Sequence, residues 1–206
     1  SSSSSSSSTP PMSLFLSNSM PVRDGEAFLY PSSGRGAAGG SFFPPSVSVN
    51  RGASGIDGIV STATGCGDTS GPTTLVCGDV TALHDLNALY GLTKDDSSSN
   101  NAQSTPNGNG PPLTTVIVNN GGGAIFSFLP ISKHGGEVGF EEYWGTPTRN
   151  FSFELGASAF GLPYESASSF EAFKDAYRSG VKNGGAAVIE ARVVGRSTNV
   201  DVHRRI

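Results

Sequence analysis

Residues 113–123 (LTTVIVNNGGG) decide the fold. The first six residues form a run of β-branched and aliphatic side chains, which is typical of a parallel strand buried on both faces. Two asparagines and three glycines follow directly, so polar groups and a permissive backbone come immediately after the strand. Because ligands of parallel sheets bind where strands end, this turn is a candidate ligand site.

The chain on both sides of this stretch alternates strand-like and helix-like segments. Further strands are predicted at 13–16, 46–49, 73–77 and 186–194. Helices are predicted at 21–30, from 58 to about 64, and at 82–92, 151–160 and 167–177. This alternation predicts the α/β class, with a parallel sheet covered by helices on both faces.

Length and composition limit the remaining possibilities. The 206 residues are enough for one domain, predicted at 13–206, with disorder expected in the Ser-rich start 1–12 and in the polar insertion 95–112. A net charge of −4 with 15% charged residues leaves no basic stripe for nucleic acid, and no apolar run approaches the ~20 residues of a membrane span. The two cysteines lack the spacing of a zinc site and are expected to be reduced, buried thiols.

The turn at residues 50–58 (NRGASGIDG) is a second candidate. Its glycines permit a tight turn just before a helix, where phosphate or another polar ligand can approach the backbone, although a simple packing turn has the same pattern. Arg51 adds a guanidinium that could bind a carboxylate or a phosphate.

A carboxylate and an amide follow two of the predicted strands. Asp79 comes after strand 73–77, where a divalent cation would compensate its charge; alternatively, Asp79 is the N-cap of the next helix. Asn120 and a glycine carbonyl could supply further oxygen ligands to Mg²⁺.

This pair resembles the diphosphate-binding signature of thiamine-diphosphate enzymes, which runs from Gly-Asp to a downstream Asn. The 41 residues from Asp79 to Asn120 exceed the usual spacing, and the polar insertion accounts for the excess. Val80 stands where a glycine commonly follows the aspartate. Longer stretches resemble one branch, the 2-succinyl-5-enolpyruvyl-6-hydroxy-3-cyclohexene-1-carboxylate synthase (MenD) family: FLSNSMPVRD (15–24), NRGASGIDGIVSTATG (50–65), GDVTALHDLNAL (78–89), VNNGGGAIFSFLP (118–130) and TNVDVHR (198–204).

The resemblance implies a thiamine-diphosphate-binding fold with thiamine diphosphate and Mg²⁺ as cofactors. The implied metal ligands are Asp79, Asn120 and the carbonyl of Gly122. The implied cofactor-binding residues are Gly52, Ala53, Ser54, Gly78, Asp79, Asn120, Gly122, Ile125 and Phe126, with Ile125 propping the bent cofactor. The implied substrate-binding residues are Ser19, Arg23, Arg51, Phe126 and Leu129.

The resemblance also implies an activity. The complete enzyme would decarboxylate 2-oxoglutarate and add the remaining unit to isochorismate, in menaquinone or phylloquinone synthesis. Only the C-terminal, diphosphate-binding part would be present, and the activating glutamate would lie in an N-terminal domain that acts across a dimer or tetramer interface. The chain alone would then be inactive. The serine tract and the insertion fit a plant or algal protein of the PHYLLO type, which would place it in the plastid; otherwise it would be cytoplasmic.

Two other functions are compatible with the sequence. The chain could bind thiamine diphosphate without turnover, or belong to a different thiamine-dependent 2-oxo acid decarboxylase or synthase. Arg23 and Arg51 favour substrates rich in carboxylates over small monocarboxylates. At the level of single residues, Ile125, Phe126 and Leu129 could be core and Arg23 could form a surface pair, while His84 and Asp85 are expected to be structural.

Overall fold

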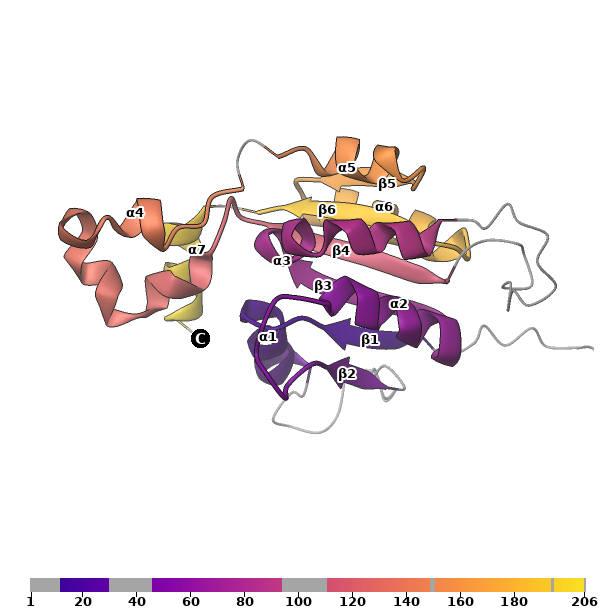
Figure 1. The fold of residues 1–206 in the computed structure, drawn as a ribbon, viewed down its shortest axis with the longest axis horizontal. Helices are drawn as coiled ribbons and strands as arrows, with labels where there is room; N and C mark the ends of the chain where they lie inside the picture. Colours follow the sequence, from indigo (N-terminus) through magenta and orange to yellow (C-terminus); the bar gives the residue numbers. More distant parts are fainter. Residues whose placement is uncertain (1–11, 30–45, 94–110, 149–150, 194, 206) are drawn as a thin grey trace, which may run out of the picture.

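A six-stranded parallel sheet forms the centre of the molecule (Figure 1). The computed structural model describes residues 12–29, 46–93, 111–148, 151–193 and 195–205, so the segments predicted to be disordered lie almost wholly outside the described residues. The strands are β1 (Ser13–Leu16), β2 (Val47–Val49), β3 (Thr73–Gly78), β4 (Leu113–Asn119), β5 (Tyr164–Ala167) and β6 (Ala187–Arg192). They lie in the order β2-β1-β3-β4-β6-β5, and every neighbouring pair is parallel.

Helices separate the strands and confirm the predicted α/β class. The α-helices are α1 (Met20–Phe28), α2 (Ile59–Ser70), α3 (Asp79–His84), α4 (Phe140–Tyr143), α5 (Phe153–Ala159), α6 (Phe170–Lys182) and α7 (Arg196–His203). Three 3₁₀ segments are η1 (Leu86–Leu92), η2 (Ala124–Phe128) and η3 (Pro130–Val138). The predicted helix 167–177 begins three residues late, because Ala167 belongs to β5, a strand that the sequence analysis missed.

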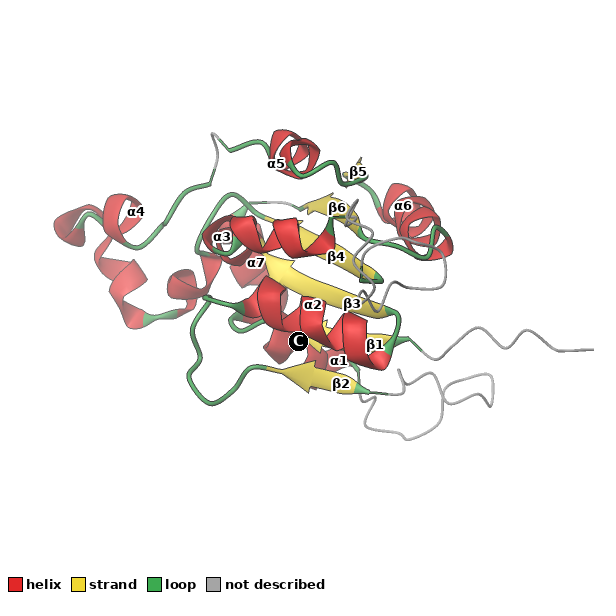
Figure 2. Cartoon of the chain, turned by 45° about the vertical axis from the view of Figure 1, so that its right-hand side comes forward, coloured by secondary structure: helices red, strands yellow, loops and turns green. Residues whose placement is uncertain are grey.

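The two faces of the sheet are covered by different helices (Figures 1 and 2). On one face, α2, η1 and α5 bury alternate strand residues such as Phe15, Leu75 and Ile117 in the main core. On the other face, α1 packs through Gly25 against Leu16, and α6 packs through Gly180 against β4 and β6. Burial on both faces explains the apolar, β-branched runs in the central strands.

The predicted helix 82–92 is wrong in one respect, because it is interrupted at Asp85. This residue has φ −109° and ψ 30°, and it separates α3 from η1. The Asp85 carboxylate accepts a hydrogen bond of 3.0 Å from the backbone N–H of Ser61, in the first turn of α2. Gly58, the N-cap of α2, supplies no side chain of its own, so Asp85 caps this helix from a distance. The structural role expected for Asp85 is thereby confirmed.

A smaller group of helices lies beyond the carboxyl ends of the strands. Segments η2, η3, α4 and α7 form this group, at the left of Figure 1. Helix α7 packs on η2, and the His203 ring meets the Phe128 ring edge-on at 5.8 Å between centroids. Among the described residues, no helix combines the length and apolar character of a membrane span.

Candidate diphosphate and metal site

A cavity of about 760 Å³ opens at the carboxyl ends of β1, β3 and β4. Its walls come from these strand ends, from α1 and η2, and from the loop before α2. Most of the predicted site residues line it, namely Ser19, Arg23, Arg51, Ser54, Gly78, Asp79, Asn120, Gly122, Ile125 and Phe126. The topology therefore gathers residues that lie up to 107 positions apart in the sequence.

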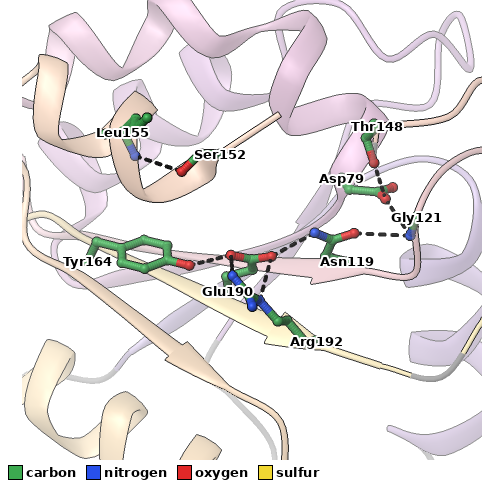
Figure 3. Close-up of polar contacts among 9 residues, drawn as sticks. All are labelled: Asp79, Asn119, Gly121, Thr148, Ser152, Leu155, Tyr164, Glu190 and Arg192. Carbon is green, nitrogen blue, oxygen red and sulfur yellow. Dashed lines mark hydrogen bonds and ion pairs between the residues drawn. The ribbon is translucent and has the colours of Figure 1, made fainter. Parts of the chain in front are cut away.

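Asp79 is the most constrained residue of this site. Its side chain is 2% exposed and accepts four hydrogen bonds. Gly121 N–H and the Thr148 hydroxyl donate to Oδ2 at 2.9 and 2.8 Å (Figure 3). Gly122 N–H donates to the same oxygen at 2.7 Å, and Val80 N–H donates to Oδ1 at 2.9 Å. Burial raises the pKa of Asp79, while these hydrogen bonds act in the opposite direction.

The geometry corrects the alternative that Asp79 caps its helix. Gly78 is the N-cap of α3, and Asp79 is the first helical residue. Its carboxylate reaches across from β3 to the glycine turn after β4, so that two strand ends are joined at one group.

Asn120 differs from Asp79 because its amide oxygen has no partner. Oδ1 of Asn120 is buried and accepts no hydrogen bond. A buried acceptor without a donor costs about 1–3 kcal/mol, and a bound cation relieves such a cost. Its neighbour Gly122 has a carbonyl that accepts only the N–H of Ala124, at 2.8 Å, among the described contacts, so a second lone pair remains. These two oxygen atoms are ligands that suit a hard cation such as Mg²⁺.

Histidines and clustered carboxylates do not contribute to this candidate metal site. In the described part of the chain, no three His, Cys, Asp or Glu side chains are grouped to hold a metal. A cation would therefore depend on one carboxylate together with amide, carbonyl and ligand oxygens.

The segment from Trp144 to Thr148 covers the glycine turn. Gly123 N–H donates to the Gly145 carbonyl at 2.8 Å, and a Cβ on Gly122 would lie 2.5 Å from that same carbonyl oxygen. Gly122 has φ +135°, which a side chain rarely permits, so glycine is required here on two counts. The Phe126 and Trp144 rings meet edge-on at 5.5 Å between centroids.

Two non-glycine residues with positive φ also border the cavity. They are Ser19, at φ 76°, and Thr146, at φ 36°, and they are the only ones among the described residues. Such conformations cost about 1–3 kcal/mol and concentrate at ligand sites. Ser19 precedes α1 and was expected from the sequence to contact substrate, whereas Thr146 was not anticipated.

Two guanidinium groups face this cavity without a carboxylate partner in the described part of the chain. Arg23 donates to the backbone carbonyl of Ser19 and Arg51 to Oδ1 of Asn18 at 3.3 Å. The Asn18 amide in turn donates to the Gly55 carbonyl at 2.6 Å, which fixes the loop before α2. The surface ion pair considered for Arg23 is therefore not formed among the described residues, and both cations can meet an anionic ligand.

The remaining predicted residues lie in two adjoining hollows. Gly52 and Ala53 border one of about 470 Å³, which shares Asn18 and Arg51 with the main cavity. Leu129, 45% exposed, borders another of about 450 Å³, which shares Arg23 and Phe126 with the main cavity. The simple core role considered for Leu129 is wrong, because its side chain is too exposed.

The histidines and cysteines take no part in the cavity at Asp79. His84 is exposed, and His134 lies 3.7 Å from Glu137 in an exposed pair. His203 contacts Oδ1 of Asp24 at 2.8 Å, and its pKa is raised by the Asn199 carbonyl and by Asp24. Both cysteines are free thiols, as expected, although Cys66 is only half-buried.

The sequence of the chain is similar to known synthases, although no family model matches it. It is 39% identical over 194 residues to the 2-succinyl-5-enolpyruvyl-6-hydroxy-3-cyclohexene-1-carboxylate synthase of Chlorobaculum parvum, covering 94% of this chain and 29% of that protein. The synthases of Bacillus velezensis and Salinibacter ruber are each 40% identical, over 193 and 194 residues, covering 93% and 94% of this chain and 29% and 28% of those proteins. The chain is homologous to one domain of these synthases.

The similarity covers only part of the synthases, and the structural match is to a protein of low sequence identity. The chain spans under a third of the length of these synthases, so the similarity describes a domain rather than a complete enzyme. Among solved structures, benzoylformate decarboxylase from Polynucleobacter necessarius superposes with a TM-score of 0.62 at 14% identity, covering 91% of this chain and 31% of that one. At this identity the superposition shows that this chain shares its fold with the matching part of the decarboxylase.

Proposed function

We propose that this chain is the C-terminal, diphosphate-binding domain of a synthase of this type, and that it binds thiamine diphosphate through Mg²⁺. The observation that carries the proposal is the buried, unpartnered Oδ1 of Asn120, which lines the same cavity as the buried Asp79. Asp79, Asn120 and the Gly122 carbonyl would hold the cation, and Gly78 would border the diphosphate. Thiamine diphosphate, when bound, would accept the electron pair that stays on the former carbonyl carbon of a 2-oxo acid as CO₂ departs.

The chain's own residues would orient the reactants. Ile125 and Phe126 would support the cofactor and exclude water from its reactive end, since both line the cavity at η2. Arg23 and Arg51 would bind carboxylates, because neither is neutralised by a described carboxylate.

The arginines favour 2-oxoglutarate and isochorismate as substrates over a small monocarboxylate. A guanidinium binds a carboxylate in a two-pronged geometry, so two of them provide orientation as well as charge compensation. A different 2-oxo acid decarboxylase remains the second candidate, because the fold is shared with benzoylformate decarboxylase.

Turnover is proposed only for the complete, oligomeric protein. The chain covers 29% of the length of a homologous synthase, so the domain by itself is expected to bind the cofactor without turnover.

Calorimetric titration of the full 206-residue chain tests the cofactor assignment. Thiamine diphosphate is titrated with and without Mg²⁺ into the wild type, Asn120→Ala and Asn87→Ala, an exposed asparagine of η1 that serves as the matched control. Binding is expected to require Mg²⁺, to be lost in Asn120→Ala and to persist in Asn87→Ala. Equal binding by all three proteins, or no binding by a wild type that circular dichroism shows to be folded, contradicts the proposal.

A second titration tests the substrate assignment. 2-Oxoglutarate and pyruvate are each added to the wild type loaded with Mg²⁺ and cofactor, and to Arg23→Gln and Arg51→Gln. The wild type is expected to prefer 2-oxoglutarate, and each variant is expected to lose about tenfold or more of that preference, the value of one charged hydrogen bond. Unchanged preference in both variants would favour a different 2-oxo acid.

A further inference from the structure

Glu190 on β6 is a buried carboxylate that does not border the cavity. Its residue is 3% exposed, and it lies on the same face of the sheet as Ile117 and Asn119. An apolar side chain at such a position would avoid the desolvation cost of a charge. A function other than packing is therefore required to explain why a carboxylate stands here.

Four hydrogen bonds converge on Glu190 (Figure 3). Asn119 Nδ2 donates to Oε1 at 2.6 Å, Arg192 donates to Oε1 at 3.2 Å and to Oε2 at 3.4 Å, and the Tyr164 hydroxyl donates to Oε2. Burial alone would raise the pKa of Glu190, but the hydrogen bonds from Tyr164, Asn119 and Arg192 outweigh it and lower the pKa. Because an amide, a hydroxyl and a guanidinium all direct their hydrogens at the Glu190 oxygens, the group facing Asn119 acts as an acceptor.

This carboxylate determines which way the Asn119 amide points. Since the NH₂ group of Asn119 must face Glu190, its Oδ1 must face the opposite direction, where it accepts the Gly121 N–H at 3.0 Å. The same Gly121 N–H also reaches Oδ2 of Asp79 at 2.9 Å. The glycine turn is therefore held from two sides, by Asp79 and by the amide that Glu190 orients.

We infer that Glu190, supported by Tyr164, is a positioning residue for the metal-binding turn and acts through Asn119 on Gly121. This inference rests on the proposed function, because it assigns a purpose to the turn that carries Asn120 and Gly122. The bonds from Gly121 and Gly122 to Asp79 hold this turn in place. The Asn120 amide oxygen and the Gly122 carbonyl oxygen would therefore be in position before a cation binds. Residues that orient metal ligands from behind typically change metal affinity by about 10- to 100-fold when removed.

Three variants and a matched control test this role in the full chain. Glu190→Leu removes the acceptor, whereas Glu190→Gln can turn its Oε1 toward Asn119 and its amide toward the Tyr164 oxygen, which can accept. Tyr164→Phe leaves the bond to Asn119 intact. Val188→Ala is the control, because Val188 is buried on the same face of β6 but belongs to the apolar core.

Two readouts separate positioning from simple stability. The first is hydrogen exchange of the Gly121 and Gly122 amides, measured by NMR at a fixed interval below each variant's thermal midpoint. The second is the Mg²⁺ dependence of thiamine diphosphate binding. Glu190→Leu is expected to speed exchange at both amides and to weaken Mg²⁺ binding about 10- to 100-fold, with Tyr164→Phe weaker in effect and Glu190→Gln close to the wild type.

The outcomes distinguish failure of this inference from failure of the proposed function. If Glu190→Leu leaves exchange and binding unchanged, or if Val188→Ala changes both equally, Glu190 does not position the turn. If the folded wild type binds no cofactor, the proposed function fails. The exchange rates alone then decide the inference, since selective loss of protection in Glu190→Leu still supports it and unchanged protection overturns it.

Discussion

Asn120 and Asp79 offer a contrast between binding and stability within one site. In Asp79→Ala, the donors of Val80, Gly122 and Thr148 lose their acceptor, while Gly121 keeps the Asn119 oxygen. Each buried donor left unpaired costs about 1–3 kcal/mol, and removal of a buried charge and entry of water offset part of this. A net loss of about 2–4 kcal/mol in the free energy of unfolding is therefore expected.

Asn120→Ala is expected to behave in the opposite way. It removes an acceptor that has no donor, so the relieved cost and the lost packing are of similar size and the free energy of unfolding changes by less than about 1 kcal/mol. Both variants should lose Mg²⁺-dependent cofactor binding. Urea denaturation monitored by circular dichroism, with calorimetry on the same samples, measures both quantities. A loss above about 2 kcal/mol in Asn120→Ala would refute the reasoning, since it would mean that Oδ1 has a stabilising partner.

Three further expectations concern other parts of the molecule. Gly122→Ala should lower the free energy of unfolding by about 2–4 kcal/mol, because its Cβ would meet backbone oxygens at 2.5 and 2.8 Å. Gly65→Ala, on an open side of α2, should raise the free energy of unfolding by about 0.5–1 kcal/mol, and denaturant titration of both variants measures these changes. The Asn199 carbonyl and Asp24 raise the pKa of His203, so its contacts to both groups stabilise the fold below the ordinary pKa of 6.5 and weaken as pH rises through the folded-state value. The advantage of the wild type over His203→Gln, below about 1 kcal/mol, should therefore shrink from pH ~5.5 to ~8.5 in thermal melts. Burial, with Asp79 and Asp85 nearby, raises the pKa of Cys77 to about 12. Iodoacetamide at about pH 8 should therefore label Cys66 in the folded protein and Cys77 only after unfolding. Rapid labelling of Cys77 in the folded protein would contradict its burial.

The sheet could be predicted from the sequence because its central strands carry a local signal. Residues 113–118 contain only aliphatic side chains and threonines, because helices cover both faces of β4 and five of the six residues are buried. β5 has no such signal: Tyr164, Glu165 and Ser166 are at least partly exposed at the edge of the sheet, and the strand exists because β6 offers a free edge beside it. The break at Asp85 was equally hidden, since the contact that causes it lies 24 residues away in α2.

The candidate site likewise contains residues that the sequence predicts and residues that it does not. Its strand-end residues could be found because parallel strands deliver their carboxyl ends to one edge, so Asp79 and Asn120 were expected to meet. Thr148 and Glu190 could not be found in this way. Thr148 reaches Asp79 across 69 positions, and Glu190 reaches Asn119 across 71, from segments whose local sequence shows no turn or motif that points to a ligand.

The entry of the chain into β4 has a consequence for protein engineering. Thr73 N–H donates to the Pro112 carbonyl at 2.9 Å, so the connection that contains residues 94–110 joins the sheet at the amino ends of the strands. Asp79 and Asn120 lie at the opposite ends of β3 and β4. A reporter domain or an affinity tag spliced into this connection would return to the sheet at Pro112, at the ends of β3 and β4 opposite Asp79 and Asn120. Each doubling of a flexible loop's length costs only about 0.6 kcal/mol, so the added length would cost the fold little.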